Sequence, residues 1–287
     1  MDNLHRPRQQ TLVTDSQDAP LIEAATAALA ASTQRVVVIE HGGRRVVAKR
    51  VADRARSRLQ ALCVRWLVKW ITGQSLPMRT LLLSDATASV AYEARRLELL
   101  AQAGVRVPRL IHVGAGYLLL EHCGPTVDAQ LGAWPVDTCR VELRRLAREL
   151  GEFHHAGHWH GAAQIKNLTS LGGHTYRIDF EEDFGELVPL PVVQALDIVL
   201  FLNSVSLVGP VDEAEARALL PALLATCLAA NPDRRVRETL ERALPWVAGL
   251  AWLSTPLRGW TVKGRKRKGV TRLGILADAL SLQLRSK

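Results

Sequence analysis

The stretch HHAGHWHGAAQIKNLTSLGGHTYRIDFEEDF, residues 154–184, determines how the rest of the chain is interpreted. Asn167 follows His160 by seven residues, and Asp179 comes after a short apparent strand in YRIDFEE. A histidine titrates near neutral pH, while amide and carboxylate oxygens are suitable ligands for a divalent cation. The segment therefore predicts a polar reaction site.

The composition is that of a globular protein with a sizeable core. The chain has 287 residues, of which 48% are hydrophobic and 23% charged. Four scattered cysteines without a CxxC pair indicate neither a disulfide framework nor a thiolate zinc site, and they favour a reducing cytoplasm: Cys63, Cys123, Cys139 and Cys227. The first 20 residues have no apolar core, and no run reaches the ~18 apolar residues of a spanning helix.

A formal net charge of +9 predicts attraction to anionic partners. These include nucleotides, nucleic acid, phosphorylated glycolipids and negatively charged membrane surfaces. Charge alone does not choose among them.

The first part of the chain alternates strand and helix patterns after a flexible segment over residues 1–20. An alanine-rich helix is predicted over 21–32. The sequence QRVVVIEHGGRRVVAKRV, residues 34–51, predicts a hairpin that turns at Gly42 and Gly43 and carries Lys49 on its second strand.

Residues 54–72, RARSRLQALCVRWLVKWIT, change to a helical period and predict a basic amphipathic helix. One face is apolar: Leu59, Leu62, Cys63, Trp66 and Trp70. Arg58, Arg65 and Lys69 occupy another face. The helix either packs its apolar stripe into a core or lies on an anionic membrane surface, where tryptophan favours the interface.

The second part is predicted to be mainly helical. Helices are expected over 88–104, 136–157, 191–208, 212–230 and 233–254, with a short strand in GYLLLEHCG, residues 116–124. The inner side of the 136–157 helix is predicted to carry Val141, Leu143, Leu146, Leu150 and Phe153. Residues 263–287 are predicted to be a basic tail. This order gives an α+β fold, with a strand-containing lobe over 21–122 and a helical lobe over 123–262.

The candidate residues suit phosphoryl transfer, which requires a cation on nucleotide phosphates, oxygen ligands for magnesium and a group that orients the acceptor hydroxyl. Lys49 lies in the strand VVAKR, and Glu93 lies in the next helix, where it can pair with the lysine. Asn167 and Asp179 are the predicted magnesium ligands. The spacing of His160 and Asn167 is that of a kinase catalytic loop.

In this order the motifs resemble the protein-kinase-like superfamily, and within it the small atypical branch of lipopolysaccharide-core (Kdo and heptose) kinases, RIO kinases and the KEOPS-complex kinase. EARRLELLAQAGVRVPRLI, LGEFHHAGHWHG and ALDIVLFL carry the resemblance, which covers roughly residues 34–270. It implies a bilobal kinase-like fold, ATP and Mg²⁺ as cofactors, and Glu121 as a further nucleotide-binding residue. It also implies that Asp197 ties down the catalytic loop.

Several positions depart from that family pattern. Ala162 replaces the catalytic aspartate, and Glu181 replaces the glycine of D-F-G. IEHGGRR is a poor glycine-rich loop, although Gly42 and Gly43 can still bring backbone amides to phosphates. Gln164 and His160 are then the candidates that face the acceptor hydroxyl.

Three functions remain open from the sequence. The first is an active kinase acting on an envelope glycolipid or saccharide, in the cytoplasm or at the inner face of the membrane. The second is a nucleotide-binding pseudokinase. The third is an RNA-associated ATPase that uses the run KGRKRKG, residues 263–269. The histidines at 154, 155, 158 and 160 are expected to serve packing and loop hydrogen bonds rather than zinc.

Overall fold

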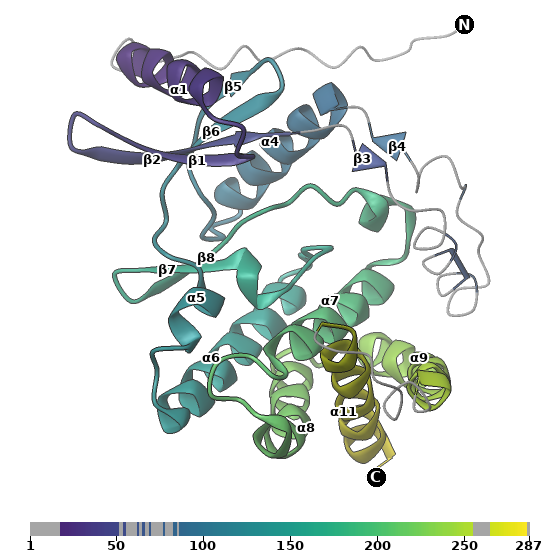
Figure 1. The fold of residues 1–287 in the computed structure, drawn as a ribbon. Helices are drawn as coiled ribbons and strands as arrows, with labels where there is room; N and C mark the ends of the chain where they lie inside the picture. The colour runs from purple at the N-terminus through teal and green to yellow at the C-terminus, as the bar shows by residue number, and fades with distance from the viewer. Residues whose placement is uncertain are drawn as a thin grey trace, which may run out of the picture.

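The computed structural model describes residues 18–51, 54–55, 62, 65–66, 69, 77, 83–84, 86–254 and 265–285. Within them the fold is α+β, as predicted: a small antiparallel sheet belongs to the first part of the chain and a group of helices to the second (Figure 1). The predicted flexible segment lies outside the described residues up to position 17, and its last two residues already belong to a helix.

The four-stranded sheet has the order β1-β2-β6-β5, with all neighbours antiparallel. Its strands are β1 (Val36–His41), β2 (Arg44–Arg50), β5 (Leu110–Gly114) and β6 (Tyr117–Glu121). Side chains alternate between the two faces of a strand. Val46 and Ala48 therefore pack beneath α1 (Ala19–Ala31), while Val47 and Lys49 point to the opposite face.

The helix α4 (Ala86–Gln102), which carries Glu93, packs against the opposite face of the sheet. Val90, Ala94 and Leu97 of this helix join Leu118 and Leu120 of β6 in the main core. The helix thus places its polar residue beside the lysine strand.

The helical part is built around α6 and α8, which pack side by side in the same direction: Arg140 contacts Glu215 near their first turns and Ala147 contacts Cys227 further along (Figure 1). Its helices are α5 (Val127–Leu131), α6 (Val136–His155), α7 (Leu190–Val205), α8 (Glu213–Ala230), α9 (Arg234–Ser254) and α11 (Arg265–Arg285). The short hairpin of β7 (Leu168–Leu171) and β8 (His174–Arg177), with the 3-10 turns η2 (Ile165–Asn167) and η3 (Phe184–Leu187), lies between the helices and the sheet.

The predicted inner face of the long helix is right at four positions and wrong at one. Leu143, Leu146, Leu150 and Phe153 are buried, but Val141 is 63% exposed. Two residues on an α-helix span about 200°, so Val141 lies on the side away from Leu143.

The prediction of a helix over 54–72 is wrong at its start. Arg54–Ala55 form β3, which pairs with β4 (Leu83–Ser84). Leu62, Arg65, Trp66 and Lys69 are helical, and the other positions lie outside the described residues. Leu62 and Trp66 are 48% and 54% exposed, so these two positions of the apolar stripe are not core residues. The ring of Trp66 contacts Trp246 of α9 at 5.5 Å.

The predicted basic tail is for the most part a packed helix. Ile275, Leu276, Ala279 and Leu280 of α11 are buried in the main core against α8 and α9. Only Lys268 and Gly269 of the basic run have described side-chain environments, and both are exposed. The apolar residues at helical spacing after the basic run account for the difference.

In the described part of the chain, none of the helices has the length and apolar character needed to cross a membrane.

Candidate functional site

A cavity of about 400 Å³ separates the sheet from the helical part. Its upper wall is apolar and comes from the sheet: Val36, Val38, Val47 and Leu120. One end is formed by the connection after β6, with Glu121, His122, Cys123 and Gly124, and its floor includes Asn167, Thr169 and Ile178. Cavities of this size suit small ligands.

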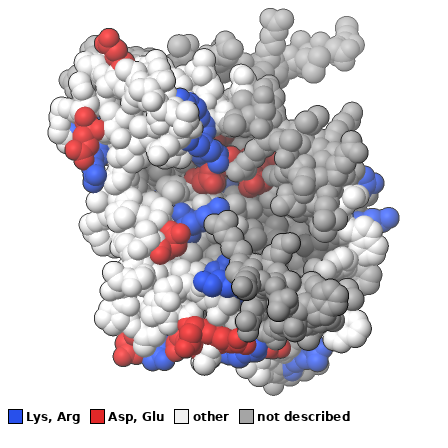
Figure 2. Space-filling view, viewed as in Figure 1, with Lys and Arg blue, Asp and Glu red and all other residues white. Residues whose placement is uncertain are grey.

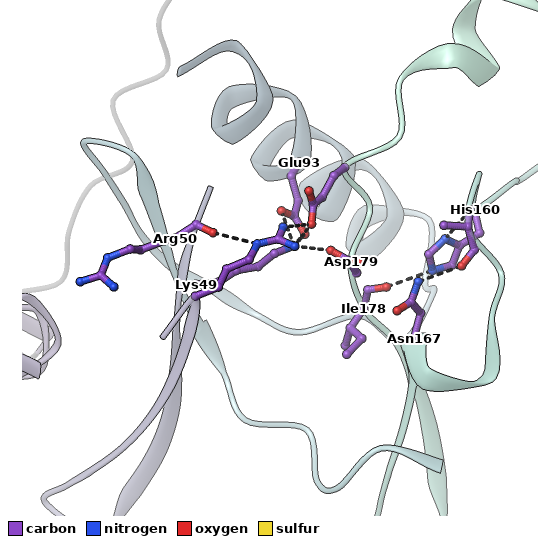
Figure 3. A network of polar contacts seen from close by, with 10 residues as sticks. Lys49, Arg50, Glu93, His160, Asn167, Ile178 and Asp179 are labelled. Carbon is purple, nitrogen blue, oxygen red and sulfur yellow. Dashed lines mark hydrogen bonds and ion pairs between the residues drawn. The ribbon is translucent and has the colours of Figure 1, made fainter. Parts of the chain in front are cut away.

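Lys49 lies at the charged end of the cavity and joins the two parts of the molecule (Figure 3). Its Nζ donates to Glu93 Oε1 at 2.7 Å and to Asp179 Oδ1 at 2.6 Å. The Lys49–Glu93 pair predicted from the sequence is therefore formed in the structure, and Asp179 lies beside it. The lysine is only 7% exposed.

Glu181 adds a third carboxylate to this lysine. Its Oε1 is 3.0 Å from Lys49 Nζ, and it also accepts a hydrogen bond from Arg35, the residue before β1. Figure 2 shows acidic residues with basic ones beside them where the sheet meets the helical part. Two cations, Arg35 and Lys49, thus face three carboxyl groups, and burial raises the pKa of one of them, Glu93.

The charges fix the protonation states of this group. Burial opposes the charged form of Lys49, but the three carboxylates outweigh it and raise the pKa of the ammonium group well above its usual value. Burial alone would raise the pKa of Asp179, yet its contacts with Glu181 and Lys49 hold that pKa well below the usual range. Lys49 is therefore protonated and Asp179 ionised at neutral pH.

The loop over residues 160–167 is held from beneath by Asp197 of α7. The carboxylate accepts hydrogen bonds from the backbone N–H groups of His160 at 2.6 Å, Gly161 at 2.9 Å and Ala163 at 3.4 Å. Although burial works against it, hydrogen bonding with His154 and the loop amides lowers the pKa of Asp197. Asp197 thus holds the loop of residues 160–167 through its backbone N–H groups.

Asn167 stabilises the same loop from its other end. Its Nδ2 donates to the carbonyl oxygen of Ala162 at 2.8 Å, and its backbone carbonyl accepts from Ile178 N at 3.0 Å. Asn167 and Asp179 both line the cavity. Asp179 has a φ of 70°, which turns the chain directly after Ile178.

The predicted placement of His160 facing an acceptor hydroxyl is wrong. Its side chain is fully buried, its Nε2 is 3.0 Å from the carbonyl oxygen of Ile178, and its ring stacks on Phe180 at 4.4 Å. Burial lowers the pKa of His160 to about 4, so the ring is neutral. His160 therefore positions the backbone before Asp179 and does not reach the cavity.

The glycines of the hairpin also lie away from the charged end. Lys49 pairs with Val36, whereas Gly42 and Gly43 turn the chain between His41 and Arg44. Five residues of extended strand separate the turn from Lys49, about 16 Å. The prediction that these glycines approach phosphates is wrong, because the strand register places them at the far end of the hairpin.

Of the two remaining predicted residues, Glu121 lines the cavity and Gln164 does not. Glu121 lines the cavity at the end of β6, 3.4 Å from Arg109. Gln164 begins the turn of η2, is partly exposed and does not line the cavity.

Two arginines of the site were not predicted. Arg35 reaches Glu181 across 146 residues of sequence, and Arg96 of α4 donates to the carbonyl oxygen of Trp159 at 2.6 Å with its guanidinium 3.8 Å above the indole ring. Arg96 thereby fixes the helix of Glu93 to Trp159, the residue before the loop of residues 160–167. Arginines are frequent in this chain, and no local pattern distinguishes these two.

Two residues that line the cavity near Lys49 carry side-chain oxygens that could bind Mg²⁺, namely Asn167 and Asp179. Oxygen ligands are those that Mg²⁺ prefers. In the described part of the chain, no group of three or more histidine, cysteine or acidic side chains is placed to hold a metal.

The sequence matches no protein-family model and no curated protein.

Proposed function

We propose that this protein is an ATP-dependent phosphotransferase with a bilobal, kinase-like architecture. The observation that carries the proposal is the position of Lys49 between Glu93 and Asp179, at the charged end of a cavity between the sheet and the helices. A buried lysine held by one helical glutamate and one aspartate after a strand is suited to phosphate binding.

The residues have separate roles in this proposal. Glu93 orients Lys49 toward the phosphates, while Asn167 and Asp179 would hold Mg²⁺. Bound Mg²⁺ neutralises the charge that develops on the transferred phosphoryl group. Asp197 and His160 hold the loop and the chain before Asp179 in place.

The missing aspartate at Ala162 is compatible with slow turnover. Loss of a general base typically costs about 10²–10⁴ in rate. In a loose phosphoryl transition state, positioning and the metal supply most of the catalysis. Because Asp197 and Asn167 bond to backbone atoms of the loop, the loop keeps its shape without a carboxylate at position 162.

The acceptor we propose is a hydroxyl of an envelope glycolipid or saccharide, reached at the inner face of the membrane. This rests on the segment around Trp66, where Leu62 is exposed beside Arg65 and Lys69. Trp66 and Lys69 are both helical positions, and tryptophan and lysine suit an anionic lipid surface. Vesicle flotation with phosphatidylglycerol tests it: the wild type should float at physiological salt, and Trp66→Ala with Lys69→Glu should not. Failure of the wild type to float removes this part of the proposal.

A nucleotide-binding pseudokinase is the second candidate. Two observations favour it: Ala162 offers no carboxylate, and Glu181 occupies Lys49. RNA binding through the basic run is a third candidate. It cannot be tested by deleting residues 263–287, because the deletion would remove core residues of α11. Charge reversal at the exposed Lys268 is the appropriate change.

The deciding experiment measures ATP binding and hydrolysis with and without Mg²⁺ for the wild type and Asp179→Asn. Asp137→Asn, an exposed aspartate at the start of α6, is the control. An enzyme shows binding that Mg²⁺ tightens and a turnover that only Asp179→Asn abolishes. Binding without turnover identifies the pseudokinase, and absence of binding in the wild type refutes both.

A further inference from the structure

A second cavity, of about 280 Å³, lies between the segment that follows α4, the second half of α6 and strand β8. It shares no lining residue with the cavity that contains Lys49. Its apolar lining includes Ala103, Val105, Phe153 and Ala156, and its charged lining is formed by Arg106, Glu149, Glu152 and Arg177. A ligand in this second cavity would therefore be separate from the proposed nucleotide.

Arg177 is a nearly buried cation in this lining. It is only 7% exposed. Its Nη2 donates to the carbonyl oxygen of Glu149 at 2.9 Å, and its guanidinium lies 4.6 Å from the ring of Phe153. Within the described part of the chain it forms no ion pair with a carboxylate, and burial lowers the pKa of the guanidinium. Buried charges in proteins are usually paired, so Arg177 lacks its expected anion.

The unused nitrogens of Arg177 are accessible from the cavity. Nε and Nη1 donate to none of the described residues, and neither atom is closed off from solvent. The side chain lines the second cavity, which gives these N–H groups access to a ligand. An ionised acceptor forms the strongest hydrogen bonds with a guanidinium. The free N–H groups thus favour an anionic ligand.

Arg106 brings a second cation to the same place. Arg177 N donates to Arg106 O at 3.0 Å, and both side chains line the second cavity. Arg106 is exposed and has no ion pair with a described residue. Of the two acidic lining residues, Glu149 is already paired with Arg145, and Glu152 is exposed. Because both glutamates would repel a doubly charged phosphate, a singly charged carboxylate suits this lining better.

We propose that the second cavity binds a small molecule through a carboxylate group, which contacts Arg177 and Arg106. The carboxylate supplies the anion that Arg177 lacks, and the rest of the ligand packs against Phe153 and the neighbouring alanines. Apolar walls with a few placed polar groups are the usual form of a small-molecule site. This site does not depend on the proposed nucleotide binding.

Fluorine NMR with 4-fluorobenzoate tests the proposal, and 4-fluorobenzamide is the neutral probe of nearly the same shape. The full chain is titrated as wild type, Arg177→Met and Arg106→Gln. Arg148→Gln is the matched control for Arg106→Gln, because Arg148 is also an exposed arginine but does not line the cavity. Thermal unfolding of each protein shows whether the variant is folded.

We expect the wild type to bind 4-fluorobenzoate with a Kd of about 1 mM, as for a fragment of this size. The benzamide should bind at least about tenfold more weakly, because it has no charge. Arg177→Met should weaken binding of the benzoate about tenfold or more, and Arg106→Gln about two- to fivefold. Arg148→Gln should bind like the wild type.

Equal binding of the two probes, or a folded Arg177→Met that binds the benzoate like the wild type, overturns this inference. If Arg177→Met does not fold, Arg106→Gln decides, and wild-type affinity in that variant overturns it. Competition distinguishes the class of anion: sodium acetate should displace the benzoate better than inorganic phosphate at equal ionic strength, and the reverse order overturns the carboxylate assignment. A wild type that binds the benzoate but no ATP refutes the proposed function and leaves this site intact.

Discussion

The group of charges around Lys49 and the loop of residues 160–167 are stabilised in contrasting ways. Around Lys49, two cations and three carboxylates from distant segments meet in one network that joins the sheet to the helical part. The loop of residues 160–167 is instead held mainly through its backbone, by the carboxylate of Asp197 on α7 and by the side-chain amide of Asn167.

The conformation of the loop and the charge balance around Lys49 therefore depend on different groups. The loop does not need a carboxylate at position 162 for its conformation, because Asp197 and Asn167 already hold its backbone N–H and carbonyl groups. The group around Lys49 depends on charge balance, and each carboxylate changes how strongly an anionic ligand binds. Substitutions on the two sides should therefore affect different measurements.

The largest expected effect is on catalysis, from Ala162→Asp. A carboxylate supported by the preformed loop should raise ATP turnover about 10²–10⁴-fold, the usual contribution of a general base. Steady-state kinetics with Mg²⁺ measures it, and Ala162→Asn is the control of similar size without charge. If turnover stays at the wild-type level in both, the loop is not at a reaction centre.

Removal of the support beneath the loop should mainly affect stability. Asp197→Ala leaves the N–H groups of His160, Gly161 and Ala163 without an acceptor, and we expect about 3–5 kcal/mol less free energy of unfolding. Urea unfolding measures this loss, and Asp197→Asn should lose less. A loss below about 1 kcal/mol would show that the loop is held by other contacts.

The buried histidine gives the protein a pH dependence. An unfolded His160 binds a proton near pH 6.5, whereas burial lowers the pKa of the folded ring to about 4. Between these values the unfolded state holds more protons, so the free energy of unfolding falls as the pH drops from 6.5 to 4.

The shift corresponds to at most about 3 kcal/mol, and His154, whose pKa burial also lowers, acts in the same direction. Urea unfolding at pH 7 and at pH 4.5 should show a shallower slope for His160→Asn than for the wild type. The exposed His155→Asn serves as the control. Equal slopes for all three proteins would contradict the buried, neutral ring.

The smallest expected effect concerns Glu181. Glu181→Gln removes one negative charge beside Lys49, so ATP affinity measured with EDTA should rise roughly three- to tenfold, and the gain from Mg²⁺ should shrink. Glu40→Gln, an exposed change on β1, is the control. An unchanged ratio of affinities with and without Mg²⁺ would show that Glu181 does not compete with phosphates.

Much of the fold and part of the site could be predicted from local patterns. The hairpin with Lys49, the helix with Glu93 and the segment from Asn167 to Asp179 each follow from residue periodicity and turn residues within about 20 positions. Their meeting follows from the order of these elements. The sequence did not predict which way individual residues face. The strand register places Gly42 and Gly43 at the end of the hairpin away from Lys49, and the side chain of His160 is buried outside the cavity.

The sequence by itself determined the element order, the α+β class and the residue types at the charged end, because propensity and periodicity act over short ranges. Only the tertiary structure decided that Arg35 and Glu181 meet across 146 residues and that α11 completes the core. These features depend on which distant side chains share a buried volume, and that is settled by packing rather than by local preference.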